Sequence, residues 1–113
     1  MLGKEAKCTS EYSDGELCVT IVGEIDHHTA TSIREQIDKE MMKYRPQVLA
    51  LELSFVSFMD SSGLGLILGR SAMAEEIGAR VCLRGAGERI MRILSMAGVE
   101  RVANIKIEKK RGK

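Results

Sequence analysis

Tryptophan is absent from the sequence, and aromatic residues make up only 4% of its 113 positions. Stacking platforms for single-stranded bases are therefore scarce. An excess of charge of one sign is missing too, because 17 basic and 16 acidic residues leave a formal net charge of +1. So small a net charge creates no field that would select nucleic acid or an anionic membrane surface. We expect a protein that binds neither.

Long hydrophobic runs are also lacking. No stretch of the sequence approaches the roughly 20 apolar residues that a membrane-spanning helix needs. The first ten residues, MLGKEAKCTS, lack the apolar core of a signal peptide. The sequence therefore predicts a soluble protein that stays in the cytoplasm.

Cysteine is scarce and irregularly placed. Cys8, Cys18 and Cys82 are odd in number, lie far apart and form no Cys-x-x-Cys pattern. Reduced structural thiols explain them better than a disulfide framework or a zinc site. We expect no metal in this chain.

The hydrophobic content, by contrast, is sufficient for one core. At 44% hydrophobic residues, the chain can bury one compact core but is too short for two ordinary domains. We therefore expect a single domain over residues 1–113. Residues 108–113, EKKRGK, are polar and mostly basic, and we expect this tail to fray.

The first part of the chain predicts a hairpin. Residues 7–23 contain two β-like runs separated at Asp14-Gly15, a pair that favours tight hairpin turns. Apolar residues alternate along the second run, as they do in a strand with one buried face. Gly23 is expected to end this strand.

Helices and strands then alternate. Residues 26–44 carry apolar residues at helical spacing with Asp26 placed as the N-cap, and the apolar run at 47–53 predicts a central strand covered on both faces. This alternation predicts an α/β fold, a mixed, mostly parallel sheet of four to five strands with helices packed on it. The further elements expected are a helix to about Ile77, a strand over 80–85, a helix from 87 that stops at Gly98, and a last strand over 102–107.

Residues 57–70, SFMDSSGLGLILGR, hold the most informative pattern. Asp60, Ser61 and Ser62 lie between the carboxyl end of a strand and the N-terminus of a helix, where α/β proteins usually place their sites. The simplest interpretation is helix capping, in which a side-chain oxygen satisfies a free N–H and contributes about 0.5–2 kcal/mol. Three candidate caps in a row exceed what one helix start requires. At least one hydroxyl is therefore available for another role.

Nucleotide binding fits this segment poorly. Gly63, Gly65 and Gly69 have the spacing Gly-x-Gly-x-x-x-Gly, whereas the dinucleotide loop requires Gly-x-Gly-x-x-Gly. No Lys-Ser or Lys-Thr follows the glycines, as a P-loop would require. Glycines inside a helix also let it lie close to a sheet.

A serine hydrolase fits poorly as well. The elbow motif Gly-x-Ser-x-Gly would need glycine at position 59, where the chain has Met59. His27 and His28 both precede the serine, whereas the fold that uses this elbow places its histidine last. Being adjacent, they cannot chelate a metal as a pair, and we interpret them as surface residues of the first helical turn.

A serine switched by phosphorylation is the remaining interpretation. A phosphate adds about −1.5 to −2 charges, and a helix N-terminus stabilises it by about 0.3–1 kcal/mol, so the domain should stay folded. The effect must then fall on a partner. The apolar pattern does not choose between Ser61 and Ser62, but with Asp60 as the N-cap, Ser61 is free at the first helical position.

Two motifs together resemble a known family. GEIDHHTA at 23–30 and SFMDSSGLGLILGR at 57–70 resemble the anti-sigma factor antagonists of the STAS domain family, and the similarity covers nearly the whole chain in order. The departures are Ile25, where the family usually has Leu, and the basic tail. The resemblance implies the STAS fold and a binding switch with no catalytic residues.

The resemblance also implies the partners. When unphosphorylated, such proteins bind an anti-sigma factor that is also a serine kinase, which releases the sporulation sigma factor F. The kinase holds the ATP or ADP, so we expect no cofactor in this chain. It phosphorylates the serine that corresponds to Ser61, and a serine phosphatase reverses the modification. We expect the free chain to be a monomer; a STAS module of another stress-signalling relay is the alternative.

The partner surface is expected to combine both motifs, because their strands can end at the same rim of the sheet. Charge reversal at Asp26 should then weaken partner binding and leave thermal stability nearly unchanged. Two questions stay open: whether Gly63 admits the partner or its own sheet, and whether Leu64 packs inside or touches the partner. The expected partner-binding residues are Glu24, Asp26, Asp60, Ser62, Gly63 and Leu64.

Overall fold

A five-stranded sheet organises the chain in the computed structural model, which describes residues 6–108. The strand order is β1-β2-β3-β4-β5; β1 and β2 are antiparallel, and each later neighbour is parallel. The predicted α/β fold with a mixed, mostly parallel sheet is therefore confirmed. The elements are β1 Ala6–Ser13, β2 Glu16–Ile25, α1 His27–Tyr44, β3 Val48–Met59, α2 Ser61–Glu76, β4 Arg80–Arg84, α3 Glu88–Met96, the 3-10 helix η1 Val99–Arg101 and β5 Ile105–Glu108.

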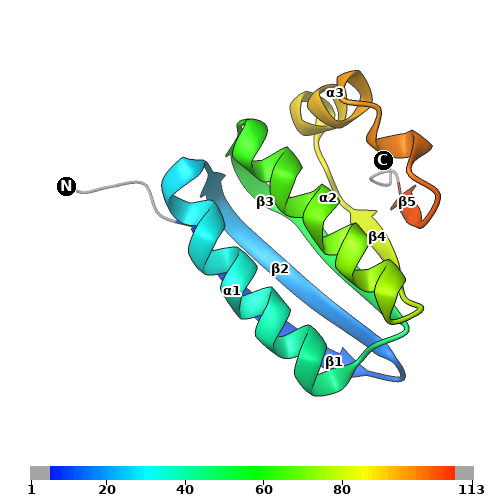
Figure 1. Cartoon of the computed structure of the whole chain (residues 1–113). Coiled ribbons are helices and arrows are strands. Elements are labelled where there is room, and N and C mark those ends of the chain that lie inside the picture. Colours follow the sequence, from blue (N-terminus) through cyan, green and yellow to red (C-terminus); the bar gives the residue numbers. More distant parts are fainter. Residues whose placement is uncertain (1–5, 109–113) are drawn as a thin grey trace.

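Helices α1 and α2 run side by side over one face of the sheet, whereas α3 lies near the far end of β4 (Figure 1). The stripe of α1 that contacts the sheet consists of Ile33, Ile37 and Met41, which are buried at helical spacing. β3 is the middle strand, and its residues 49–51 are completely buried. This agrees with the central strand that the apolar run predicted.

The hairpin between β1 and β2 turns at the predicted pair. Asp14 has φ 52° and Gly15 has φ 81°, so both residues are in the left-handed region. A two-residue turn with two positive φ values matches the right-handed twist of the flanking strands. The Asp-Gly pair therefore fixes the register of β1 on β2.

Both strands that lead to the candidate site are longer than predicted. β2 continues through Gly23 to Ile25, because Gly23 adopts φ 113° beside a shift of register and bends the strand without ending it. β3 continues beyond residue 53 to Met59, since residues 55–59 pair with the end of β2. Two phenylalanines and a valine in this extension favour the extended backbone.

The last elements follow the prediction with small shifts. α2 ends beside Gly78, which has φ 76°, and α3 ends beside Gly98, which has φ 74°. The last strand begins at Ile105 rather than 102, because η1 and a turn occupy the residues before it. Glu108, expected to begin the frayed tail, instead closes β5; residues 109–113 lie outside the described residues.

One ion-pair network ties separated strands together. Arg84 of β4 donates from both Nη atoms to the Glu16 carboxylate of β2, each at 2.8 Å. Its Nε also lies 3.2 Å from the carboxylate of Glu108 in β5. Because β3 lies between β2 and β4, the pair of Arg84 with Glu16 crosses β3, and the contact with Glu108 adds β5.

Candidate functional site at the N-terminus of helix α2

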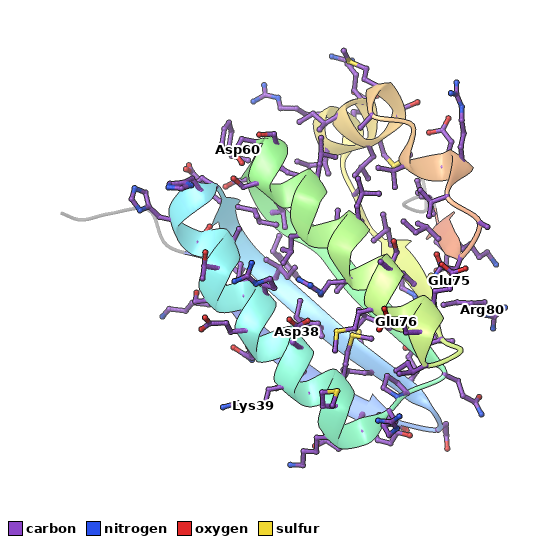
Figure 2. The ribbon with its side chains drawn as sticks, in the orientation of Figure 1. Asp38, Lys39, Asp60, Glu75, Glu76 and Arg80 are labelled. Atoms are coloured by element: carbon purple, nitrogen blue, oxygen red, sulfur yellow. The ribbon has the colours of Figure 1, made fainter. Side chains whose placement is uncertain are left out.

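The carboxyl ends of β2 and β3 meet at one end of the sheet. Ile25 pairs with Met59, and the N–H of Asp60 donates to the carbonyl oxygen of Ile25 at 3.2 Å. Asp26 and Asp60, which follow the two strands, are therefore held at the same rim. Figure 2 shows Asp60 at the start of α2, on the side where α1 also begins.

Asp60 caps α2 and leaves the first serine free. Its Oδ1 accepts the backbone N–H of Ser62 at 2.8 Å, and its carbonyl oxygen accepts that of Gly63 at 2.9 Å. Ser61 is consequently the first residue of α2, and it is exposed, whereas Ser62 is half-buried. The capping interpretation is thus correct for Asp60, and the Ser61 hydroxyl remains accessible to a second protein.

Asp26 caps α1 through a reciprocal pair of hydrogen bonds. Its Oδ1 accepts the N–H of Thr29 at 3.0 Å and that of His28 at 2.9 Å, while its own N–H donates to Oγ1 of Thr29 at 2.9 Å. The Thr29 hydroxyl in turn donates to the carbonyl oxygen of Glu24 at 2.8 Å. This confirms the predicted N-cap and fixes the loop between β2 and α1.

These hydrogen bonds perturb the Asp26 carboxylate. The N–H of Thr29, and secondarily that of His28, hold the pKa of Asp26 below its ordinary value. Charge reversal at this position would therefore remove a cap as well as a charge. The expectation that it leaves thermal stability nearly unchanged has to be revised for that reason. His28 and its neighbour His27 are exposed in the first turn, as predicted.

Gly63 and Leu64 face the protein's own interior to different degrees. A Cβ on Gly63 would collide with the Met59 side chain and lie 3.3 Å from Cγ2 of Ile25, so the glycine lets α2 approach its own sheet. Gly63 is buried and offers no surface of its own to a partner. Leu64 is half-buried and packs against the core.

The comparisons with known proteins agree with this arrangement. The sequence pattern of the STAS domain matches residues 7–112. The chain belongs to the STAS domain family. An anti-sigma F factor antagonist of Paenibacillus polymyxa is 35% identical over 95 residues, which cover 84% of this chain and 81% of the relative. An anti-sigma-B factor antagonist of Listeria monocytogenes is 31% identical over 88 residues, 78% of this chain and 76% of the relative.

The solved structure of the anti-sigma factor antagonist SpoIIAA has the same STAS fold. Its unphosphorylated form matches with a TM-score of 0.77 at 24% identity, over 90% of this chain and 88% of that chain. Its phosphorylated form matches with a TM-score of 0.70, also at 24% identity, over 90% and 91%. The STAS fold predicted from the two motifs is therefore confirmed.

This STAS domain also exposes apolar side chains that the sequence analysis missed. Val22, Phe55 and Phe58 are 49%, 60% and 43% exposed, respectively. Val22 pairs with Phe55, and Glu24 pairs with Phe58, so the three apolar side chains form a patch near the carboxyl ends of β2 and β3, beside Glu24. The missed signal is the composition of residues 54–59, which is typical of a strand although the predicted strand covered only residues 47–53.

Among residues 6–108, no three His, Cys, Asp or Glu side chains lie close enough together to hold a metal ion. Burial raises the pKa of Cys8, Cys18 and Cys82, which favours the protonated thiols near neutral pH. Within the same residues, no helix is long and apolar enough to cross a membrane.

Proposed function

We propose that this chain is a phosphorylation-controlled antagonist of an anti-sigma factor. In its unphosphorylated form it binds an anti-sigma factor that is also a serine kinase, and so releases the sporulation sigma factor F. Phosphorylation of Ser61 by that kinase ends the binding, and a serine phosphatase restores it. The chain is a binding protein rather than an enzyme, acts in the cytoplasm as a monomer, and holds no cofactor, since ATP or ADP belongs to the kinase.

One observation carries the proposal: Ser61 is exposed at the first position of a capped helix, where the ends of β2 and β3 meet. The names of the relatives, anti-sigma F and anti-sigma-B factor antagonists, supply the class of partner. The SpoIIAA structures in unphosphorylated and phosphorylated forms supply the precedent for a modified antagonist.

The partner surface would centre on Ser61. Asp60, the N-cap of α2, and Ser62 flank it in the sequence, while Glu24 at the end of β2 and Asp26 before α1 lie at the neighbouring strand end. The apolar patch of Val22, Phe55 and Phe58 extends this surface along the strand ends. Gly63 would act indirectly, by setting the depth of α2 on the sheet, and Leu64 would contribute only its exposed part.

The local charges explain how a phosphate would break the complex. A phosphate on Ser61 adds about −1.5 to −2 charges next to the carboxylate of Asp60. At the N-terminus of α2 the backbone N–H groups and macrodipole stabilise that charge, so the fold persists. The kinase surface, which fits an uncharged hydroxyl, would face repulsion and an unfavourable loss of hydration.

A second candidate partner comes from the same comparisons. The relative from Listeria monocytogenes is named for sigma B rather than sigma F. In this alternative the chain is a STAS module of another stress-signalling relay, with the same chemistry at Ser61 and a different kinase. Binding assays against both kinds of anti-sigma kinase, at equal protein concentrations, distinguish the two.

The modification site is tested by mass spectrometry. The purified chain is mixed with its anti-sigma kinase and ATP, and intact and peptide masses are taken for wild type, Ser61→Ala and Ser62→Ala. We expect one phosphate on wild type and on Ser62→Ala, and none on Ser61→Ala. Phosphate on Ser61→Ala, or none on any variant, would overturn the proposed switch.

A further inference from the structure

A groove lies between the N-terminal halves of α1 and α2, and of its lining residues the proposed function uses only Ser62. Its volume is about 410 Å³. Figure 2 shows the two helices side by side along this length, with their side chains pointing toward each other. The residues that line it include His27, Ala30 and Arg34 from α1, and Ser62, Gly65, Gly69 and Arg70 from α2.

The two glycines keep this groove open. A Cβ at Gly65 or at Gly69 would meet no atom within 4 Å, so neither glycine is needed for close packing. Gly63 is different, because it lies directly against the sheet. Glycine is a poor helix former, and two of them one turn apart weaken α2 without a packing reason. Their effect on the structure is the space that they leave over Arg70.

Arg70 is a buried cation with unused hydrogen-bonding capacity. Only 8% of its surface is exposed. Its Nε lies 2.9 Å from Oδ1 of Asp38, a residue whose side chain as a whole is partly exposed. Its Nη1 is buried and has no hydrogen-bond partner within residues 6–108. A buried guanidinium group whose N–H atoms lack acceptors is unfavourable, so a negative charge that met this group from the groove would be stabilised.

The charge around the groove favours an anion. Arg34 and Arg70 both line it, and the carboxylates of α1 and α2 are absent from its lining. Burial lowers the pKa of Arg70, Asp38 raises it, and the nearby positive charge of Arg34 lowers it again. The guanidinium groups of Arg34 and Arg70 repel each other, and the carboxylate of Asp38 is paired with Arg70. One positive charge at the groove is therefore left without a paired carboxylate.

We propose that this groove is an oxyanion-binding site, in which a phosphate or carboxylate group accepts hydrogen bonds from the part of the Arg70 guanidinium group that lines it. Arg34 supplies a second positive charge at the mouth, and the half-buried Ser62 hydroxyl supplies a further donor at the N-terminal end. Planar guanidinium groups match both kinds of oxyanion geometrically. The oxyanion is either a free phosphate or an acidic side chain of a bound protein.

The site is tested by titrating the full chain with sodium phosphate and following backbone amide and arginine Nε–H signals by NMR, with sodium chloride at matched ionic strength as the blank. We expect saturable shifts at Gly65, Gly69 and Arg70, with a dissociation constant on the order of 1 mM. Arg70→Gln should weaken binding at least tenfold. Arg89→Gln, an exposed arginine on α3, is the matched control and should bind like wild type.

A second variant separates loss of the site from loss of the fold. Gly69→Leu fills the groove at a position where a Cβ meets nothing, so its melting temperature should not fall. We expect it to lose the phosphate-dependent shifts. Shifts that rise linearly without saturation, or that saturate equally in wild type, Arg70→Gln and Gly69→Leu, would overturn the proposal.

A second experiment identifies the source of the oxyanion. The affinity of Gly69→Leu for the anti-sigma kinase is compared with that of wild type. A loss of tenfold or more assigns the groove to an acidic side chain of that protein. Unchanged kinase affinity, together with saturable phosphate binding to wild type, assigns it to a free phosphate.

Discussion

Glycine has two different effects within the first turns of α2. Gly63 is buried, and a Cβ there would collide with the Met59 side chain, whereas a Cβ at Gly65 would meet nothing within 4 Å. The same substitution should therefore have opposite effects at two positions that are two residues apart. In Gly63→Ala the overpacking costs about 1–3 kcal/mol, and the better helix propensity of alanine offsets at most about 1 kcal/mol of it.

We expect Gly63→Ala to lower the free energy of unfolding by about 1–2 kcal/mol. Gly65→Ala, the matched control, should raise it by about 0.5–1 kcal/mol, because only the propensity changes. Urea denaturation of both variants beside wild type measures the difference. Equal stabilisation by both substitutions would show that α2 does not lie on the sheet as tightly as described.

Asp26 gives the loop before α1 a dependence on pH. Its pKa is lower in the folded chain, chiefly through the N–H of Thr29, so the folded state favours the ionised carboxylate. Its contribution is therefore complete above the unfolded pKa of about 3.9 and is lost as the pH falls through the folded value.

Asp26→Asn tests this contribution, because asparagine is also a good N-cap but does not titrate. We expect wild type to melt slightly higher than Asp26→Asn at pH 7, and the difference to shrink as the pH falls through the lowered pKa of Asp26. Thermal melts across this range measure it. A difference that is constant with pH would assign the effect to the cap geometry alone, and one that grows in acid would contradict the lowered pKa.

At the scale of elements, local chemistry predicts where helices begin more reliably than where strands end. Asp26 and the Asp14-Gly15 turn were located from the sequence because each acts through its own neighbours. Gly23 was expected to end β2, yet the strand continues because residues 55–59 pair with it from a distant part of the chain. The exposed Phe55 and Phe58 were missed for the same reason.

The ion pairs of Arg84 connect β2, β4 and β5, so they stabilise the sheet as a whole. Arg84 lowers the pKa of Glu16 through its hydrogen bonds, so this stabilisation is present above about pH 4.3 and is lost as the pH falls further. All three side chains are partly exposed, which limits the gain to about 1 kcal/mol.

We expect Arg84→Met, which keeps much of the apolar stem, to lower the free energy of unfolding by about 0.5–1 kcal/mol at pH 7 and low salt. The loss should shrink in 1 M salt and near pH 2. Arg80→Met is the control, because Arg80 is exposed on the same strand and forms no ion pair within residues 6–108. Chemical denaturation of both variants measures these free energies of unfolding. Equal losses of stability in Arg84→Met and Arg80→Met would show that the ion pairs do not stabilise the sheet.

At the scale of the whole molecule, the proposed switch lies on a rim and not in the core. Ser61 is exposed at the end of the sheet where β2 and β3 finish, and α2 continues from it over the buried face (Figure 1). A charge added there is near the positive end of a helix dipole. Phosphorylation should therefore leave the fold intact and change only what the rim binds.

The two motifs predicted the rim because each combines a strand end with a helix cap. Asp60 as N-cap and Ser61 as the free hydroxyl follow from local rules. The burial of Gly63 and the groove over Arg70 could not be predicted in this way, since both depend on how α2 lies against β3 and α1. Periodicity was uninformative there, because the first turns of α2 are apolar on nearly every side.

The most direct test of the switch is calorimetric titration of the anti-sigma kinase with the chain in two states, unphosphorylated and phosphorylated on Ser61, alongside a thermal melt of each. We expect the phosphorylated chain to bind at least about thirtyfold more weakly, a difference of about 2 kcal/mol, with an unchanged melting temperature. Equal affinity of the two forms would contradict a switch at Ser61. A large fall in melting temperature on phosphorylation would contradict its location on a rim outside the core.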